Sequence, residues 1–152
     1  FLDVNLRSPW YNKDTIQRAL LRAEIVKTNE EELKIICDMF EPACSNDKDR
    51  ALFLLKKFDL QHLFVTCGER GAWVLSDNGE EKAEGQGLNS ALIDTVGAGD
   101  AFSAICMVGF LHGWPMQKTL IRASTFASAL CTIQGPAPET HDFYLPYIDS
   151  WF

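Results

Sequence analysis

A glycine turn stands at the point where the most apolar segment of the chain begins. Residues 94–100 read DTVGAGD, and they lead directly into residues 101–111, whose composition predicts an apolar helix ending at Leu111 or His112. Glycine permits tight turns and a close approach of the backbone to a ligand. The first N–H groups of a helix lack intrahelical partners, and the helix dipole is positive there. The turn Gly97-Ala98-Gly99 therefore predicts an anion site suited to phosphate.

An acidic residue follows this turn in the first turn of the predicted helix. Asp100 cannot itself bind a phosphate, because the two charges repel each other. It can act as a general base that accepts a proton from an attacking hydroxyl group. The alternative is a structural glycine turn followed by an aspartate that simply favours a helix N-terminus.

Strand-like and helix-like segments alternate along the rest of the chain. This alternation predicts one α/β layered domain with a mostly parallel sheet, without a linker that would divide it. Asp14 and Asn29 are the expected N-caps of the first two helices. Asp77-Asn78-Gly79 predicts a hairpin turn, and a loop is expected around Gly85 and Gly87. The expected strands are residues 1–6, 24–27, 61–66, 72–76 and 80–83. The expected helices are residues 14–23, 30–39, 48–58, 100–112 and 115–133.

Composition narrows the class of protein. The 152 residues are 47% hydrophobic and 23% charged, which is typical of one soluble globular domain and excludes collagen, low-complexity disorder and a disulfide-built miniprotein. No stretch reaches the roughly 20 apolar residues of a membrane helix. The net charge of −7 argues against nucleic acid and anionic membranes as partners, but a few backbone N–H groups can still hold a small anion.

Five cysteines without C-x-x-C spacing predict reduced thiols in the cytoplasm rather than disulfides or a zinc site. The three histidines have no nearby partner residues in the sequence and are expected to be structural. The aromatic tail, residues 141–152, is expected to dock on the protein's own core. The chain begins with Phe1, in a strand-like segment, so we expect it to be a piece of a longer protein.

At this point the sequence resembles a known family. D-T-x-G-A-G-D followed by Ala-Phe is similar to the signature of the PfkB, or ribokinase-like, carbohydrate kinases. Three weaker strings agree in the family's order. Asp3 to Arg7, followed by Pro9 and Trp10, resembles the D-x-N-x-R segment of fructokinases and 2-keto-3-deoxygluconate kinases. Asn29 to Glu32 resembles an N-x-x-E motif, and Thr66 to Gly71 resembles a T-x-G-x-x-G turn.

The resemblance implies a three-layer ribokinase-like fold, of which residues 1–152 form the C-terminal, nucleotide-binding part. The N-terminal part, with the lid and most contacts to the sugar, is absent from this sequence. The implied activity is ATP-dependent phosphorylation of a sugar hydroxymethyl group, with fructose as the first acceptor and 2-keto-3-deoxygluconate as the second. The implied cofactors are ATP, Mg²⁺ and K⁺, and the intact relatives often form homodimers.

The resemblance also assigns roles to single residues. Asp100 is the expected base, and the glycine turn offers its N–H groups to the γ-phosphate. Asn29 and Glu32 are expected to organise Mg²⁺ through water, and Asp94 to help hold a monovalent cation. The remaining expected contacts are Thr66, Gly68, Gly71 and Thr95 with ATP, and Asn5 and Arg7 with the acceptor or the transferring phosphate.

Plainer interpretations remain open for the weaker strings. Residues 30–32 can be a solvated acidic run at a helix start, residues 66–71 a turn at a strand end, and Arg7 a surface residue. A second function class is a truncated paralogue that binds nucleotide or a partner without kinase activity. A dehydrogenase is disfavoured, because a dinucleotide-binding glycine turn opens the first βα unit, whereas this turn comes late in the chain.

Overall fold

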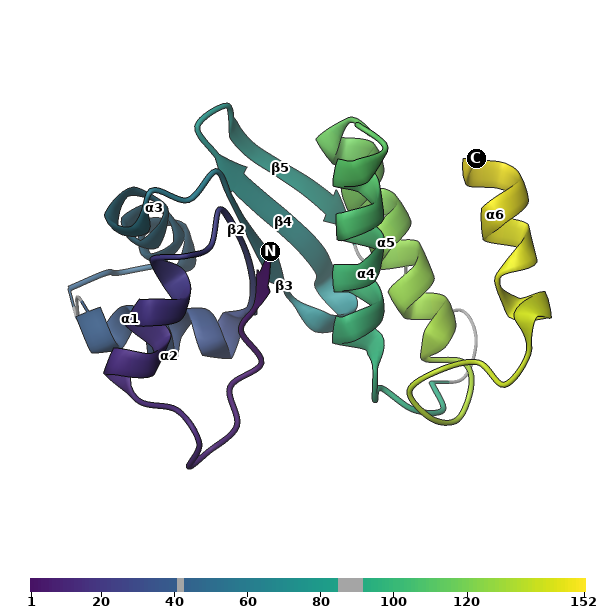
Figure 1. Ribbon diagram of the computed structural model, residues 1–152, viewed down its shortest axis with the longest axis horizontal. Coiled ribbons are helices and arrows are strands. Elements are labelled where there is room, and N and C mark those ends of the chain that lie inside the picture. Colours follow the sequence, from purple (N-terminus) through teal and green to yellow (C-terminus); the bar gives the residue numbers. More distant parts are fainter. Residues whose placement is uncertain (41–42, 85–91) are drawn as a thin grey trace.

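The computed structural model describes residues 1–40, 43–84 and 92–152, which form a sheet with helices on both faces (Figure 1). The strands are β1 (Leu2–Asp3), β2 (Ile25–Asn29), β3 (His62–Thr66), β4 (Gly71–Ser76) and β5 (Gly79–Glu84). The helices are α1 (Lys13–Leu20), α2 (Glu30–Phe40), α3 (Asp47–Phe58), α4 (Ala98–Leu111), α5 (Met116–Leu130) and α6 (Leu145–Trp151).

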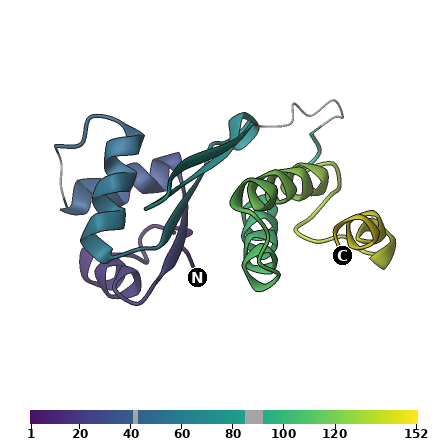
Figure 2. The same ribbon diagram turned by 90° about the horizontal axis from the view of Figure 1, so that it is seen from above.

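The elements form three layers. Helices α1, α2 and α3 cover one face of the sheet, and α4 and α5 lie on the other face, with α6 outside them (Figure 2). The predicted α/β three-layer architecture is therefore confirmed.

The strand order in the sheet follows the chain, from β1 to β5. β1, β2 and β3 are parallel neighbours, and β4 is antiparallel to both β3 and β5. Four of the five described strands therefore run in the same direction, as the prediction of a mostly parallel sheet required. The carboxyl ends of β1, β2 and β3 consequently lie at one edge of the sheet, where ligands of open α/β sheets bind.

Strand β3 shows how the sheet separates two apolar cores. Leu63 and Val65 pack into the core beneath α1, α2 and α3, whereas Phe64 between them packs against α4 and α5. The Phe64 ring meets the Phe102 ring edge-on at 6.3 Å. Both faces of this central strand are apolar because both are covered by helices.

Two predicted boundaries at the N-terminal end are wrong. Helix α1 is capped by Asn12, whose side chain accepts a hydrogen bond from Thr15 N at 2.9 Å, while Asp14 lies inside the first turn. Both residue types cap well, but only Asn12 has the extended backbone of a cap. Strand β1 ends at Asp3 rather than at residue 6, because the chain turns away from the sheet through Asn5, whose φ is +40°.

The hairpin prediction is confirmed. Ser76 pairs with Gly79, so Asp77 and Asn78 form the two-residue turn between β4 and β5. The loop predicted around Gly85 and Gly87 lies outside the described residues.

The aromatic tail docks on the chain's own core, as expected. The Phe126 ring of α5 lies 5.0 Å from the Tyr147 ring of α6, with further ring contacts to Phe143, Tyr144 and Trp151. The histidine rings also pack against aromatic residues: His62 against Phe110, His112 against Trp114 and Phe152, and His141 against Tyr144.

The cysteines form no disulfide, and three of the five are buried. Burial raises the pKa of the Cys67 thiol to about 11, which keeps it protonated at neutral pH. Among the described residues, no helix combines the length and apolar character needed to cross a membrane.

Candidate active site

The carboxyl ends of β2 and β3 bring two predicted site residues together. Asn29 and Thr66 are the last residues of these strands and stand opposite each other in the register. Asn29 also caps helix α2: its Oδ1 accepts a hydrogen bond from Glu32 N at 2.8 Å, and Glu32 Oε2 accepts one from Asn29 N at 2.9 Å. This reciprocal pair is a capping box, which fixes where α2 begins.

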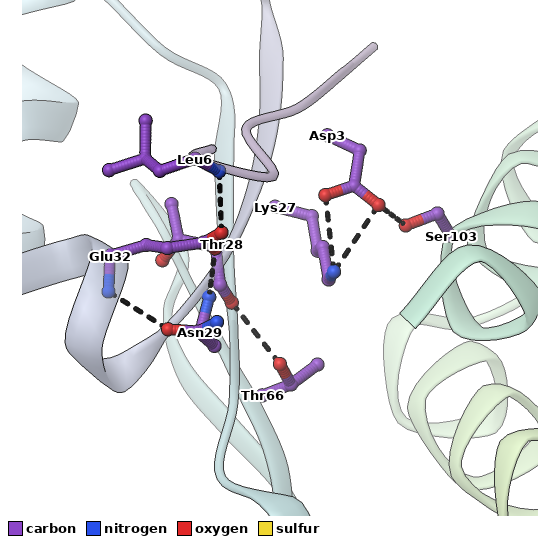
Figure 3. A network of polar contacts seen from close by, with 8 residues as sticks. All are labelled: Asp3, Leu6, Lys27, Thr28, Asn29, Glu32, Thr66 and Ser103. Atoms are coloured by element: carbon purple, nitrogen blue, oxygen red, sulfur yellow. Dashed lines mark hydrogen bonds and ion pairs between the residues drawn. The ribbon is translucent and has the colours of Figure 1, made fainter. Parts of the chain in front are cut away.

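The second carboxylate oxygen of Glu32 holds the segment that follows β1. Glu32 Oε1 accepts a hydrogen bond from Leu6 N at 2.9 Å, and the residue is only 7% exposed (Figure 3). Each carboxylate oxygen keeps a further lone pair after these bonds. Glu32 therefore joins three segments of the chain at the sheet edge, and its free lone pairs fit a contact to a metal's water shell.

Asn5 lies in this tied-down segment. Its left-handed backbone is tolerated better by asparagine than by most residues. The preceding residue is also fixed to the sheet, because Val4 N donates to Lys27 O at 3.0 Å. The turn at Asn5 is thus held from both sides, and Asn5 lines the cleft described below.

The glycine turn is built as the sequence predicted. Gly97 is the N-cap of α4, with a φ of +84°, and the helix then runs for 14 residues. A Cβ atom at Gly97 would lie 2.6 Å from Pro136 O, so the backbone of the segment after α5 approaches it closely. Ala98 N donates to Thr95 O at 3.2 Å, which closes the turn just before the helix.

Asp94 holds this turn in place through two hydrogen bonds. Its Oδ1 accepts a hydrogen bond from Val96 N at 3.0 Å, and its Oδ2 accepts one from Gly135 N at 3.0 Å. These two N–H groups, Val96 first and Gly135 second, hold the pKa of the carboxyl below its ordinary value. The carboxylate thus connects the approach to α4 with the segment that follows α5.

A cleft of about 410 Å³ lies between this edge of the sheet and helices α4 and α5. Most predicted site residues line it together, although they come from distant parts of the chain. They are Asn5, Asn29, Glu32, Thr66, Gly68, Gly71, Thr95, Ala98 and Gly99.

Four predicted residues stand outside this lining. Gly97, at the start of the turn, lies against Pro136, and Asp94 accepts a hydrogen bond from Gly135 N. Asp100 is in the first turn of α4, as predicted, but it is exposed to solvent beside the cleft. Arg7 is also exposed, two residues beyond Asn5.

Sequence reasoning missed one wall of the cleft and a charged residue beside the glycine turn. The wall comes from α5 through the small residues Ser124, Ala127 and Ser128, a segment that the sequence predicted only as a helix. Ser124 Oγ is buried without a hydrogen-bond partner among the described residues. The missed charged group is Lys27, which is 6% exposed and also lines the cleft. An unusual lysine between Val26 and Thr28 in an apolar strand was the available signal.

The geometry fits a bound phosphate. Ala98 and Gly99, at the start of α4, line the same cleft as Lys27, and the first N–H groups of a helix are suited to an anion. A side chain at Gly99 would intrude on that ammonium, since its Cβ would lie 3.0 Å from Lys27 Nζ. No group of three or more His, Cys, Asp and Glu residues that could hold a metal occurs in the described part of the chain.

Fold and site together define an α/β protein in which a glycine turn and a helix N-terminus line a cleft at the carboxyl ends of parallel strands. The sequence profile of the pfkB family of carbohydrate kinases matches residues 2–142. This chain belongs to that family, and the resemblance seen in its motifs is confirmed.

Individual relatives carry different names. A fructokinase of Vibrio alginolyticus is 33% identical over 145 residues, which cover 89% of this chain and 45% of the fructokinase. An adenosine kinase of Saccharomyces cerevisiae is 28% identical over 133 residues, which cover 85% of this chain and 39% of that enzyme. The chain thus spans less than half the length of these curated relatives.

Solved structures share the fold. An E. coli protein assigned as a ribokinase II, solved in complex with ATP and Mg²⁺, superposes with a TM-score of 0.75 at 21% identity. The superposition covers 88% of this chain and 42% of the E. coli chain. The three-layer fold seen here is therefore that of ribokinase-like kinases.

Proposed function

We propose that this chain is the C-terminal, nucleotide-binding part of a kinase that transfers the γ-phosphate of ATP to a hydroxymethyl oxygen of a small sugar. One observation carries the proposal. The glycine turn that opens α4 faces the same cleft as Asn29 and Thr66, at the carboxyl ends of parallel strands. The N-terminal part of the protein would supply the lid and most contacts to the sugar.

Phosphoryl transfer needs aligned reactants, neutralised charge and a group that orients the nucleophile. We assign the neutralisation of the phosphate charge to the glycine turn Gly97-Ala98-Gly99, through those of its N–H groups that Thr95 O does not engage. We assign the proton to Asp100, which accepts it from the sugar hydroxyl as the new P–O bond forms and the bond to ADP breaks. The exposed position of Asp100 beside the cleft supports this role, because the acceptor must arrive from outside the nucleotide part.

We assign the remaining roles to residues that line the cleft and to Asp94, which lies outside its lining. Thr66, Gly68, Gly71 and Thr95 would contact ATP. A Cβ at Gly68 would meet no atom within 4 Å, so its backbone is open to a ligand. Asn29 and Glu32 would hold the water shell of Mg²⁺, because their side-chain oxygens keep free lone pairs after accepting backbone hydrogen bonds. Asp94 would help to hold K⁺ near the glycine turn.

The acceptor that we favour is fructose. Asn5 lines the cleft, Arg7 is exposed two residues further along the chain, and both belong to the segment that resembles fructokinases and 2-keto-3-deoxygluconate kinases. The fructokinase among the relatives supports this choice, with 2-keto-3-deoxygluconate as the second sugar. A nucleoside is the second candidate class, and the adenosine kinase among the relatives favours it. The setting that we propose is the cytoplasm, with a homodimer as the intact assembly.

The first test is calorimetric titration of the 152-residue chain with Mg-ATP in K⁺ buffer. We expect the unchanged chain and Asp100→Asn to bind ATP, and a variant with Gly97→Ala and Gly99→Ala to lose binding. Absence of binding by a folded unchanged chain would mean that the nucleotide site needs the rest of the protein. Binding without phosphoryl transfer to any acceptor by the full-length protein would favour the non-kinase paralogue.

The second test addresses the base. In the full-length protein, Asp100→Asn is expected to lower kcat by about 10²–10⁴, the usual contribution of a general base, with little change in ATP affinity. The assay should compare fructose, 2-keto-3-deoxygluconate and adenosine as acceptors. Turnover near the unchanged level in this variant would refute the assignment of Asp100.

A further inference from the structure

The Lys27 ammonium is a buried charge for which the roles proposed above give no reason. Lys27 lies in the middle of β2 on the side of Ile25, which packs against the α4 and α5 core, whereas Val26 packs into the opposite core. The residue is 6% exposed, although burying a charge is unfavourable unless a partner compensates it. A lysine at this position therefore needs an explanation in contacts.

The immediate partner is Asp3, at the end of β1. Lys27 Nζ lies 3.1 Å from Asp3 Oδ1 and 3.2 Å from Asp3 Oδ2. Ser103, in α4, donates its hydroxyl hydrogen to Asp3 Oδ2 at 2.6 Å. Figure 3 shows the Lys27 side chain reaching from β2 towards Asp3 and α4. Asp3 thus fixes the ammonium, and Ser103 fixes Asp3.

The position of the Lys27 ammonium indicates a second contact besides this ion pair. Lys27 Nζ is the nearest atom to a side chain placed at Gly99, in the first turn of α4. The N-terminal end of a helix is positive, so a buried cation is disfavoured there unless an anion lies close to both the cation and the helix end. In the described part of the chain, the hydrogen-bond acceptors of Nζ are the two oxygens of a single carboxylate, whereas an ammonium carries three donors.

We infer that Lys27 binds a non-bridging oxygen of the γ-phosphate that rests on the glycine turn. The inference rests on the proposed function and deepens it. Lys27 and the N–H groups of α4 approach the same anion from two sides, and Lys27 lines the same cleft. Asp3 and Ser103 are positioning residues, since they hold the ammonium at Gly99 without touching the phosphate.

During transfer the P–O bond to ADP breaks and a P–O bond to the acceptor oxygen forms, while Asp100 takes the hydroxyl proton. The Lys27 ammonium keeps its own protons and donates a hydrogen bond throughout. A fixed cation at this place stabilises the charge on the transferring group without reorganising during the reaction. The group that distinguishes ATP from ADP is the one that Lys27 contacts, so its removal should affect the two nucleotides differently.

The test compares Mg-ATP with Mg-ADP on the full-length protein by calorimetry. Lys27→Met keeps an unbranched side chain that is one heavy atom shorter and removes the charge. Because it leaves Asp3 without its partner, a second variant combines Lys27→Met with Asp3→Asn, which removes both charges. Lys34→Met, on the exposed side of α2, is the matched control. Lys27→Arg tests rescue by a conserved charge.

We expect Lys27→Met, alone and with Asp3→Asn, to weaken ATP binding about 10- to 100-fold and to leave ADP binding within about twofold, as for loss of a charge-assisted hydrogen bond. Lys27→Arg should retain part of the preference for ATP. If the double variant keeps the full preference, or if the unchanged protein shows none, Lys27 serves only the ion pair and the inference fails, while the proposed kinase stands. If the unchanged protein binds no nucleotide, both the inference and the proposed function fail.

Discussion

The contact between Gly97 and Pro136 sets the strictest requirement on the glycine turn. Gly97→Ala would place a Cβ 2.6 Å from Pro136 O and 2.8 Å from Pro136 Cα, in a backbone with φ of +84°. The left-handed conformation costs alanine about 1–2 kcal/mol. Displacing the Pro136 backbone adds about 1–3 kcal/mol, as for other overpacked sites. We therefore expect Gly97→Ala to lower the free energy of unfolding by about 2–5 kcal/mol.

The matched control is Gly135→Ala. Gly135 has a φ of +86°, but a Cβ there would meet no atom within 4 Å, so only the conformational cost of about 1–2 kcal/mol applies. Urea unfolding followed by tryptophan fluorescence measures both variants under the same conditions. Equal losses in Gly97→Ala and Gly135→Ala would refute the argument, because the contact with Pro136 would then contribute nothing.

Two further predictions concern side chains that hold the site. Ser103→Ala removes a hydrogen bond to the Asp3 carboxylate and should lower the free energy of unfolding by about 1.5–3 kcal/mol; a loss below 0.5 kcal/mol, roughly the surface level, would contradict it. Asp94 has a lowered pKa in the folded chain, so its charged form stabilises the fold above the ordinary carboxyl pKa of 3.8, and that stabilisation is lost as the pH falls through the lower folded value. Asp94→Asn should therefore destabilise the chain at pH 7 and make its melting temperature less sensitive to acid. Melting curves recorded at several pH values measure this, and an unchanged fall of the melting temperature at low pH would contradict the prediction.

The glycine turn was predictable because its signal is local. Two glycines, an acidic residue and an apolar run lie within a few positions, and they determine a helix start whatever surrounds it. The hairpin at Asp77 and Asn78 was predictable for the same reason. The capping box of Asn29 and Glu32 is equally local, but the bond from Leu6 to Glu32 is not, since 26 positions separate the two residues.

The boundaries of β1 and α1 were missed because neighbouring residues of similar propensity compete. Asn12 and Asp14 can both cap a helix, and the extended backbone at Asn12 decides between them. The apolar alternation of residues 1–6 favours a strand throughout. The hydrogen bond that Glu32 accepts from Leu6 N, and the left-handed turn at Asn5, end that strand early.

Lys27 shows why the sequence could signal a residue of the site without predicting its surroundings. A lysine in a strand is ordinarily a sign of an exposed position, and its burial here depends on α4, which begins about 70 positions later. The bond between Ser103 and Asp3 joins residues 100 positions apart. That bond fastens the second turn of α4 to the end of β1, while Pro136 confines the cap of the same helix. The glycine turn supplies donors for an anion, but the place where those donors point is set by these long-range contacts. A sequence that kept the glycine motif and lost Asp3, Lys27 and Ser103 would therefore keep the motif without the geometry on which the proposed phosphate site depends.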